Sequence, residues 1–272
     1  MGEDFNKVWP EMLRDILCNG NEVAPRGRVT SEVLHKTICV DTRLPVLLHK
    51  ERKLSYQFMA AEAYWILSGD NSVEGIEPWN KHIAQFSDNG ETFFGAYGPK
   101  IYDQIKYVCE KLMEDPNTRQ AGLTIWRENP PETKDVPCTV AIFFSIRNSR
   151  LNAHVFMRSS DAWLGVPYDV FNFSMLTHLV CGHLNVKQSV RNPTPTPKII
   201  PGDLYLTMAS SHLYYDNFKA AEACVKAWDD RTFSVYQPEV PDELYENYIG
   251  LLDTLNVLRN SKKDSQIRWW NS

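Results

Sequence analysis

The sequence predicts an α+β protein, with helices packed around one sheet in a single domain that covers residues 1–272. Helical and strand periodicities of apolar residues both occur, without the strict alternation that a parallel βαβ fold requires. No repeat, low-complexity block or linker divides the chain, and 272 residues are enough for one large domain with a substantial core.

Three helices are expected in the first half of the chain, because apolar residues recur there at helical spacing between clear end signals. Gly20 and Gly69 end the first two patterns, and prolines bound the third. The expected helices cover residues 4–20, 54–70 and 99–116.

Strands are expected in the middle of the chain, where runs are rich in β-branched and aromatic residues and a short polar turn (RNSR) joins two of them. The expected strands cover residues 121–126, 139–146, 151–157 and 203–214. Further helices are expected over residues 170–184, 217–228 and 243–258, and the proline-rich segment 191–202 is expected to be a surface loop.

Composition narrows the class of protein. Hydrophobic residues make up 43% of the chain and aromatic residues 12%, which indicates a packed globular protein rather than a disordered one. No apolar run reaches the ~20 residues of a membrane span, and the N-terminus is too acidic for a signal peptide, so a cytoplasmic location is expected (host cytoplasm for a viral protein). The net charge of −5 does not favour nucleic-acid binding.

The six cysteines form no CxxC pair and no His/Cys spacing typical of a metal site, so no metal is predicted. In a reducing compartment they are expected to be free thiols, and most of them to act as small buried hydrophobic residues. Only Cys138 has neighbours in the sequence that indicate chemistry.

Cys138 follows a proline and precedes a predicted strand, a position from which a thiol can face a cleft. A thiolate is a strong nucleophile, and a neighbouring arginine lowers the pKa of its thiol. The next strand ends in Arg158 and Ser159, and a guanidinium beside a hydroxyl suits a phosphate group. A surface salt bridge is the plainer interpretation of Arg158 alone, but its combination with Cys138 and LGVPYD (164–169) favours a site.

The order of these motifs resembles the thymidylate synthase family over about residues 20–220. The resemblance lies in PC, a strand, RSSDAWLGVPYD, a long apolar helix and PGDLYLTMASSHLYYDNF, and upstream in PRGRVTSE, EAYWILSGDN, FFGAYG and DPNTRQ. It implies a thymidylate synthase-like domain with a central mixed sheet, a homodimer formed through that sheet with shared active sites, and 5,10-methylenetetrahydrofolate as co-substrate.

One departure from the family concerns the nucleotide base. The family has asparagine in a PFN turn, whereas this chain has PYD, with Asp169 in its place. The change resembles the phage-type branch of the family that hydroxymethylates deoxycytidylate (dCMP). A carboxyl group can share a proton with cytosine N3 while accepting from N4, which also assists addition at C6. A helix cap is the plainer role of Asp169, and the two roles are compatible.

The resemblance implies a covalent mechanism. Cys138 adds to C6 of dCMP, C5 takes up the one-carbon unit, and water attacks the resulting exocyclic methylene to give 5-hydroxymethyl-dCMP and tetrahydrofolate. Glu62 corresponds to the family's carboxylate and is assigned to proton transfer and to ordering the water. A glutamate on so apolar a helix is costly without such a role.

Water access separates hydroxymethyl from methyl transfer. Where thymidylate synthases have a W-x-x-W pattern that shields the methylene, this chain has Ile83 and Phe86. A smaller residue at position 83 is expected to admit water. Trp79 is an alternative occupant of the same space.

The remaining site residues rest on the resemblance alone. Arg26, Arg158 and Ser159 are expected to hold the 5′-phosphate, with Arg119 reaching in from the other subunit. The sugar 3′-hydroxyl is assigned to His212 and Tyr214. The pterin slot is assigned to Asp161, Leu164, Gly165, Tyr168 and Ile83.

Other activities remain open at this point. They are a dCMP methyltransferase that keeps the reductive step, an enzyme acting on CMP or dUMP, and an inactive relative that only binds nucleotide or a protein partner. The presence of Cys138, Glu62 and Asp169 argues against the last. Direct binding of nucleic acid or of a membrane is not expected.

Overall fold

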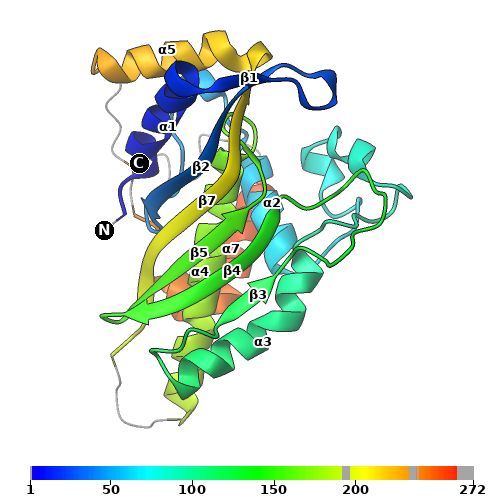
Figure 1. Cartoon of the computed structure of the whole chain (residues 1–272). Coiled ribbons are helices and arrows are strands. Elements are labelled where there is room, and N and C mark those ends of the chain that lie inside the picture. The colour runs from blue at the N-terminus through cyan, green and yellow to red at the C-terminus, as the bar shows by residue number, and fades with distance from the viewer. Residues whose placement is uncertain (1, 192–196, 233–236, 238, 262–272) are drawn as a thin grey trace.

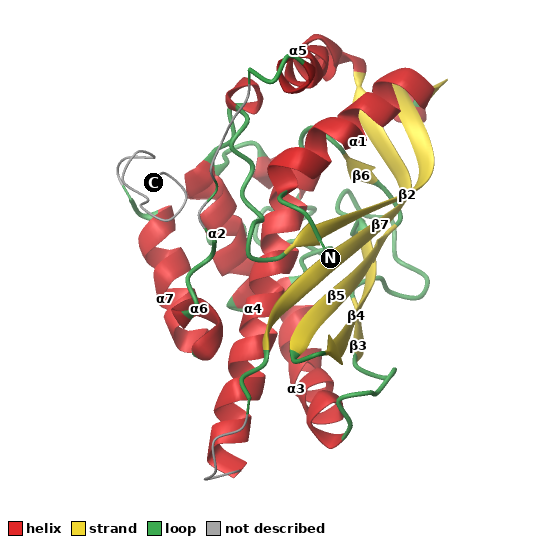
Figure 2. Cartoon of the chain, turned by 90° about the vertical axis from the view of Figure 1, so that its left-hand side faces the viewer, coloured by secondary structure: helices red, strands yellow, loops and turns green. Residues whose placement is uncertain are grey.

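One sheet organises the molecule, with its main helices on one side (Figures 1 and 2). This is a computed structural model, and the structure describes residues 2–191, 197–232, 237 and 239–261. The described residues form a seven-stranded sheet in the order β1-β2-β7-β5-β4-β3, with β6 beside β7. The strands are β1 (Asn21–Val23), β2 (Thr30–Asp41), β3 (Gly122–Thr124), β4 (Thr139–Arg147), β5 (Arg150–Met157), β6 (Ser160–Asp161) and β7 (Ile200–Tyr214).

The long strand β7 connects the two halves of the sheet. It runs antiparallel to β2 and parallel to β5 and β6, so the sheet is mixed and the predicted α+β class is confirmed. Because β6 pairs with the end of β7 through Ser160↔Ser211 and Asp161↔His212, residues far apart in the sequence meet at this end of the sheet.

The helices are α1 (Phe5–Asn19), α2 (Tyr56–Leu67), α3 (Gly98–Glu114), α4 (Val166–Arg191), α5 (Phe218–Asp229), α6 (Glu243–Glu246) and α7 (Tyr248–Arg259). Helix α4 is apolar on all sides, and it is accordingly buried between the sheet and the outer helices α2 and α7 (Figure 2). It thereby holds its first turn, residues 166–169, rigidly beside β6.

Several sequence predictions were wrong in detail, among them the single helix over 243–258, which the structure divides into α6 and α7. No strand was predicted over β2, whose charged and exposed positions (Glu32, His35) break a simple apolar alternation. Helix α4 begins at Val166 rather than at residue 170. The predicted loop 191–202 is shorter, because Arg191 ends α4 and Ile200 begins β7; its residues 192–196 lie outside the described residues.

The face of the sheet opposite the main helices carries exposed aromatic residues. Phe143 is 41% exposed and Phe156 45%, and His154 stacks on Tyr205 with ring centroids 4.9 Å apart. Within the described part of the chain, no helix is both long and apolar enough to span a membrane. All six cysteines are free thiols.

Candidate active site

Cys138 lies directly before β4, where two cavities of similar size meet. The first has a volume of about 640 Å³ and the second about 630 Å³. Cys138, Ser159, Ser160 and Asp161 line both, because the end of β5 and β6 form the wall between them. We call these the polar cavity and the aromatic cavity.

The Arg158 side chain fixes the loop that carries Cys138. Its guanidinium donates to the main-chain oxygens of Val136 (2.9 Å) and Pro137 (3.0 Å) and to Ser159 Oγ (3.0 Å). It also lies 3.6 Å from Cys138 Sγ. With several of its donors used inside the protein, Arg158 orients the thiol as well as contributing charge.

The Cys138 thiol is half-buried, and burial raises its pKa, while the Arg158 charge lowers it. The sequence predicted that a neighbouring arginine would lower this pKa. Arg158 does act in that direction, but burial has the larger effect, so the pKa of Cys138 is raised overall.

The polar cavity brings together Arg26, Arg158, Ser159, His212 and Tyr214, five residues predicted to bind the nucleotide. Arg26 sits in a tight turn at φ +54°, in the left-handed region that non-glycine residues rarely adopt, so the turn imposes its conformation. The His212 and Tyr214 rings meet edge to face at the end of β7, with centroids 5.3 Å apart.

Glu32 and Lys134 are among the residues of the polar cavity that were not anticipated. Glu32 on β2 lies opposite His212 in the sheet and accepts a hydrogen bond from Ser210 Oγ. Lys134 comes from the loop before Cys138. No sequence signal marked Glu32, because its strand was not recognised.

Asp169 lies in the first turn of α4 and lines the aromatic cavity. Its amide donates to Gly165 O (3.0 Å) and its side chain accepts from Ser160 Oγ (3.2 Å). A capping residue precedes its helix, so the alternative interpretation of Asp169 as a helix cap is wrong. A Cβ at Gly165 would lie 3.2 Å from Asp161 O, closer than ordinary contact, and 3.4 Å from Asp169 Oδ2.

Glu62 faces Asp169 from helix α2. Asn172 Nδ2, one turn beyond Asp169 on α4, donates to Glu62 Oε2 at 2.7 Å. Burial raises the pKa of Glu62 to about 7, and burial together with the Glu62 charge raises the pKa of Asp169 to about 7. Both side chains keep some exposed surface, which faces the cavity. Near neutral pH the pair can therefore hold and exchange protons.

The aromatic cavity also contains the residues expected to bind the pterin, namely Asp161, Leu164, Gly165, Tyr168 and Ile83. The Tyr168 ring packs edge to face on Phe58, with centroids 5.0 Å apart. Asp161 Oδ1 accepts from the amides of Trp163 (2.8 Å) and Leu164 (2.9 Å), which fixes the turn into α4.

Ile83 and Trp79 line the same aromatic cavity. Trp79 Nε1 donates to Arg259 O at 2.7 Å, and the Arg259 guanidinium lies over the Trp79 ring. Trp79 is thus held in place by α7. Ile83 and Trp79 both line the cavity, so either residue can shield the methylene from water.

Arg119 is the one predicted site residue that the fold does not bring to either cavity. It is exposed in the connection between α3 and β3. Tyr97, by contrast, was missed, although it belongs to the FFGAYG motif; its ring stacks on Phe173 and its hydroxyl accepts from Thr139 N at 3.3 Å, beside Cys138. Burial raises its pKa.

Comparison with known proteins identifies the family of this chain. Residues 7–235 match the thymidylate synthase family, and the chain belongs to that family. Over 244 residues it is 28% identical to a protein of Bacillus phage SP01 described as a deoxyuridylate hydroxymethyltransferase. The match covers 80% of this chain and 59% of the relative, so the chain spans less than two thirds of that protein's length.

Proposed function

We propose that this protein is a folate-dependent one-carbon transferase that converts dCMP, 5,10-methylenetetrahydrofolate and water into 5-hydroxymethyl-dCMP and tetrahydrofolate. The observation that carries the choice of base is the Asp169 carboxyl, which has a pKa of about 7 and faces a cavity next to Cys138. A protonated carboxyl donates to cytosine N3 and accepts from the N4 amino group, and uracil presents the opposite pattern.

The chemistry assigns one task to each group. Cys138 Sγ bonds to C6 of the base, and the proton held by Asp169 stabilises the charge that develops at N3. Glu62, held by Asn172, assists removal of the C5 proton as tetrahydrofolate leaves, and it orients the water that attacks the methylene carbon. Release of Sγ then frees the product.

The residues present fit the two ligands. Arg26, Arg158, Ser159 and the partner subunit's Arg119 supply donors for the 5′-phosphate, and His212 and Tyr214 lie where a sugar hydroxyl follows. Aromatic and apolar walls suit a pterin, and Asp161 Oδ2 is left for its N–H donors. The folate supplies a one-carbon unit at the oxidation level of formaldehyde.

The second candidate is hydroxymethylation of deoxyuridylate, which the description of the phage SP01 relative favours. The deciding experiment compares dCMP and dUMP with methylenetetrahydrofolate, measuring tritium release from C5 and the mass of each product. A large excess of 5-hydroxymethyl-dCMP supports the proposal, and preferential turnover of dUMP overturns the choice of base. A methylated product accompanied by dihydrofolate would identify a methyltransferase.

The proposal also includes a homodimer, formed through the face of the sheet opposite the main helices. Support comes from the exposed Phe143 and Phe156 on that face and from the position of Arg119 outside its own chain's cavities. Mixing Arg119→Ala with Cys138→Ser chains is expected to restore activity, because one hybrid site keeps both residues. No recovery in verified heterodimers would contradict shared sites.

A further inference from the structure

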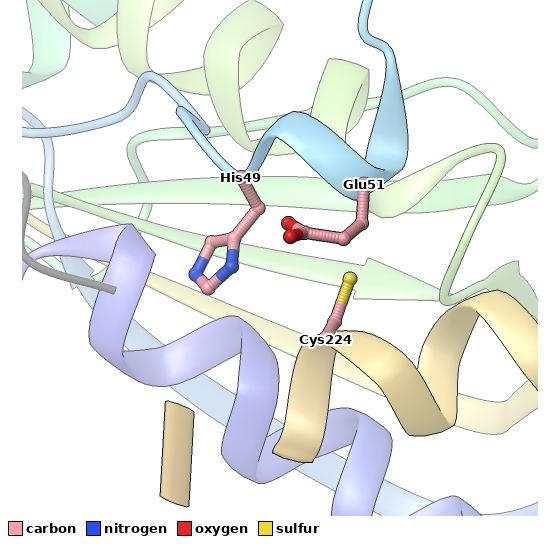
Figure 3. A group of neighbouring side chains, drawn as sticks. All are labelled: His49, Glu51 and Cys224. Carbon is pink, nitrogen blue, oxygen red and sulfur yellow. The ribbon is translucent and has the colours of Figure 1, made fainter. Parts of the chain in front are cut away.

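A second group of chemically active side chains lies apart from both cavities. His49 and Glu51 belong to the short turn before α2, and Cys224 comes from α5 (Figure 3). One ligand atom of each residue lies within 4.8 Å of the other two. In Figure 3 the carboxylate of Glu51 and the sulfur of Cys224 approach the same space beside the His49 ring.

The backbone selects the tautomer of His49. Its Nε2 lies 3.1 Å from the main-chain oxygen of Asn6, and a carbonyl oxygen only accepts, so Nε2 carries the proton. The lone pair is therefore on Nδ1. A carbonyl that binds one ring nitrogen is the usual way in which proteins orient a histidine whose other nitrogen binds a metal.

Asn6 itself is held firmly. Its side chain accepts from Leu48 N (2.7 Å) and donates to Val46 O (2.9 Å), so both ends of the segment leading to His49 are tied to α1. His49 is only 2% exposed. The imidazole is thus placed by the fold and does not depend on a ligand for its orientation.

We propose that His49 Nδ1, Glu51 and Cys224 Sγ bind one zinc ion, with a fourth position left for water. Nitrogen, sulfur and carboxylate oxygen together suit Zn²⁺, whereas Mg²⁺ and Ca²⁺ prefer oxygen alone. Tetrahedral zinc with these ligands requires them about 3.3–3.8 Å apart, so atoms now within 4.8 Å of one another must close by at most roughly 1 Å. Glu51 is exposed, and its side chain is free to make most of that movement.

Charge balance supports the same assignment. Metal binding displaces the thiol proton of Cys224, so the bound sulfur is a thiolate. The thiolate and the Glu51 carboxylate then neutralise the two charges of the ion. Pairing with the ion keeps the Cys224 thiolate from being an isolated charge beside the buried His49.

The site joins α5 to the turn that also positions a wall of the aromatic cavity. Arg52, next to Glu51, donates from Nε to Trp163 O (2.5 Å), and its guanidinium lies over the Tyr168 ring. Glu51 groups with His49 and Cys224, whereas Arg52 lines the aromatic cavity. A metal at Glu51 is expected to stabilise the turn without entering the catalytic cavities.

The test uses the full-length, metal-stripped chain and ZnCl₂ alone, with calorimetry for affinity and stoichiometry and thermal unfolding for stability. Cys224→Ser is expected to weaken zinc binding at least about 100-fold, since even outer-shell changes cost 10–100-fold. Glu51→Gln, an exposed change that spares the core, is expected to weaken it about 10-fold. Cobalt substitution reports thiolate ligation through a sulfur-to-metal charge-transfer band, which Cys224→Ser abolishes.

Matched controls exclude other thiols. Cys138→Ser tests the candidate nucleophile, and Cys18→Ser tests an exposed thiol; both are expected to retain one zinc per chain and the zinc-dependent rise in melting temperature. Three outcomes would each overturn the proposal. They are no zinc binding by the folded wild type, zinc binding by Glu51→Gln and Cys224→Ser that is as tight as in the wild type, and loss of zinc binding in Cys138→Ser. None of these results depends on the proposed enzymatic activity.

Discussion

The two cavities at Cys138 are nearly equal in volume but differ in how they hold charge. In the polar cavity, Arg26, His212 and Tyr214 stand at the surface of the sheet's end, and Arg26 is exposed. In the aromatic cavity, Glu62 and Asp169 lie among Phe58, Tyr97 and Tyr168, and their pKa values rise to about 7.

The difference separates binding from chemistry. Exposed cations are screened by solvent and change little on binding an anion, so the polar cavity contributes affinity in modest steps. The pKa of a carboxyl that is removed from bulk water changes strongly when a neighbouring charge changes. The nucleotide base produces such a change when charge develops on its ring during the reaction. Substitutions in the polar cavity should therefore act on KM, and those in the aromatic cavity on kcat.

The largest effect is expected at the residue that both cavities share. Cys138→Ser replaces the thiolate by a neutral hydroxyl and should lower kcat by more than roughly 10³-fold while leaving dCMP binding nearly unchanged. Rapid-quench assays and equilibrium dialysis measure the two quantities. A serine variant that kept a few per cent of the wild-type rate would refute covalent addition at C6.

Asp169→Asn tests the aromatic cavity directly. The amide has no exchangeable acid proton for N3, so kcat/KM for dCMP should fall at least about tenfold, and loss of one such group can cost on the order of 10²–10³-fold. The amide also suits uracil, so the dUMP-to-dCMP ratio of kcat/KM should rise. Both constants are measured on one preparation. An unchanged ratio would show that another residue recognises the base.

The sequence predicted many of the residues that line the two cavities, because its motifs are local. PC, RSSD and LGVPYD each lie within one turn or strand end, so Cys138, Arg158 and Asp161 were predicted with their neighbours. Relations across the sheet were not predictable in the same way. The pairing of Glu32 with His212, the Asn172–Glu62 hydrogen bond and the grouping of His49 with Cys224 each depend on contacts between segments far apart in sequence.

Glu62→Gln should show what the buried carboxyl costs the fold. The folded pKa of Glu62, about 7, lies above the unfolded value of 4.5, so the native state holds a proton that the unfolded chain releases. The free energy of unfolding of the wild type therefore falls as pH rises from about 4.5 to 7 and then stays low. Glutamine does not titrate.

Between pH 4.5 and 8 the stability difference should shift by about 2 kcal/mol in favour of Glu62→Gln, a figure reduced to allow for the solvated cavity. Urea unfolding at both pH values gives the difference, with the exposed Glu91→Gln as control. If the difference is independent of pH, the Glu62 carboxyl is not desolvated as its surroundings indicate.

A smaller effect is expected in the polar cavity. Arg26→Ala removes one phosphate donor from an exposed turn and should raise KM for dCMP about tenfold at low salt, with kcat nearly unchanged. Steady-state kinetics at two ionic strengths give the result, with Lys106→Ala, an exposed cation that lines neither cavity, as the control. A drop in kcat as large as that in kcat/KM would mean that the two cavities are not separable in this way.

The smallest effect is expected at Ile83, which lines the aromatic cavity without a polar role. Ile83→Trp fills part of the space next to Trp79, so water should reach the exocyclic methylene of the bound nucleotide more slowly. Hydroxymethyl product should form a few-fold more slowly, and an added thiol should trap more of the intermediate. Ile83→Leu keeps the side-chain volume and serves as the control. If the two variants form product equally fast and trap equal amounts of intermediate, another residue of the cavity controls the access of water. Trp79, whose ring nitrogen donates to the Arg259 carbonyl, is then the next residue to change.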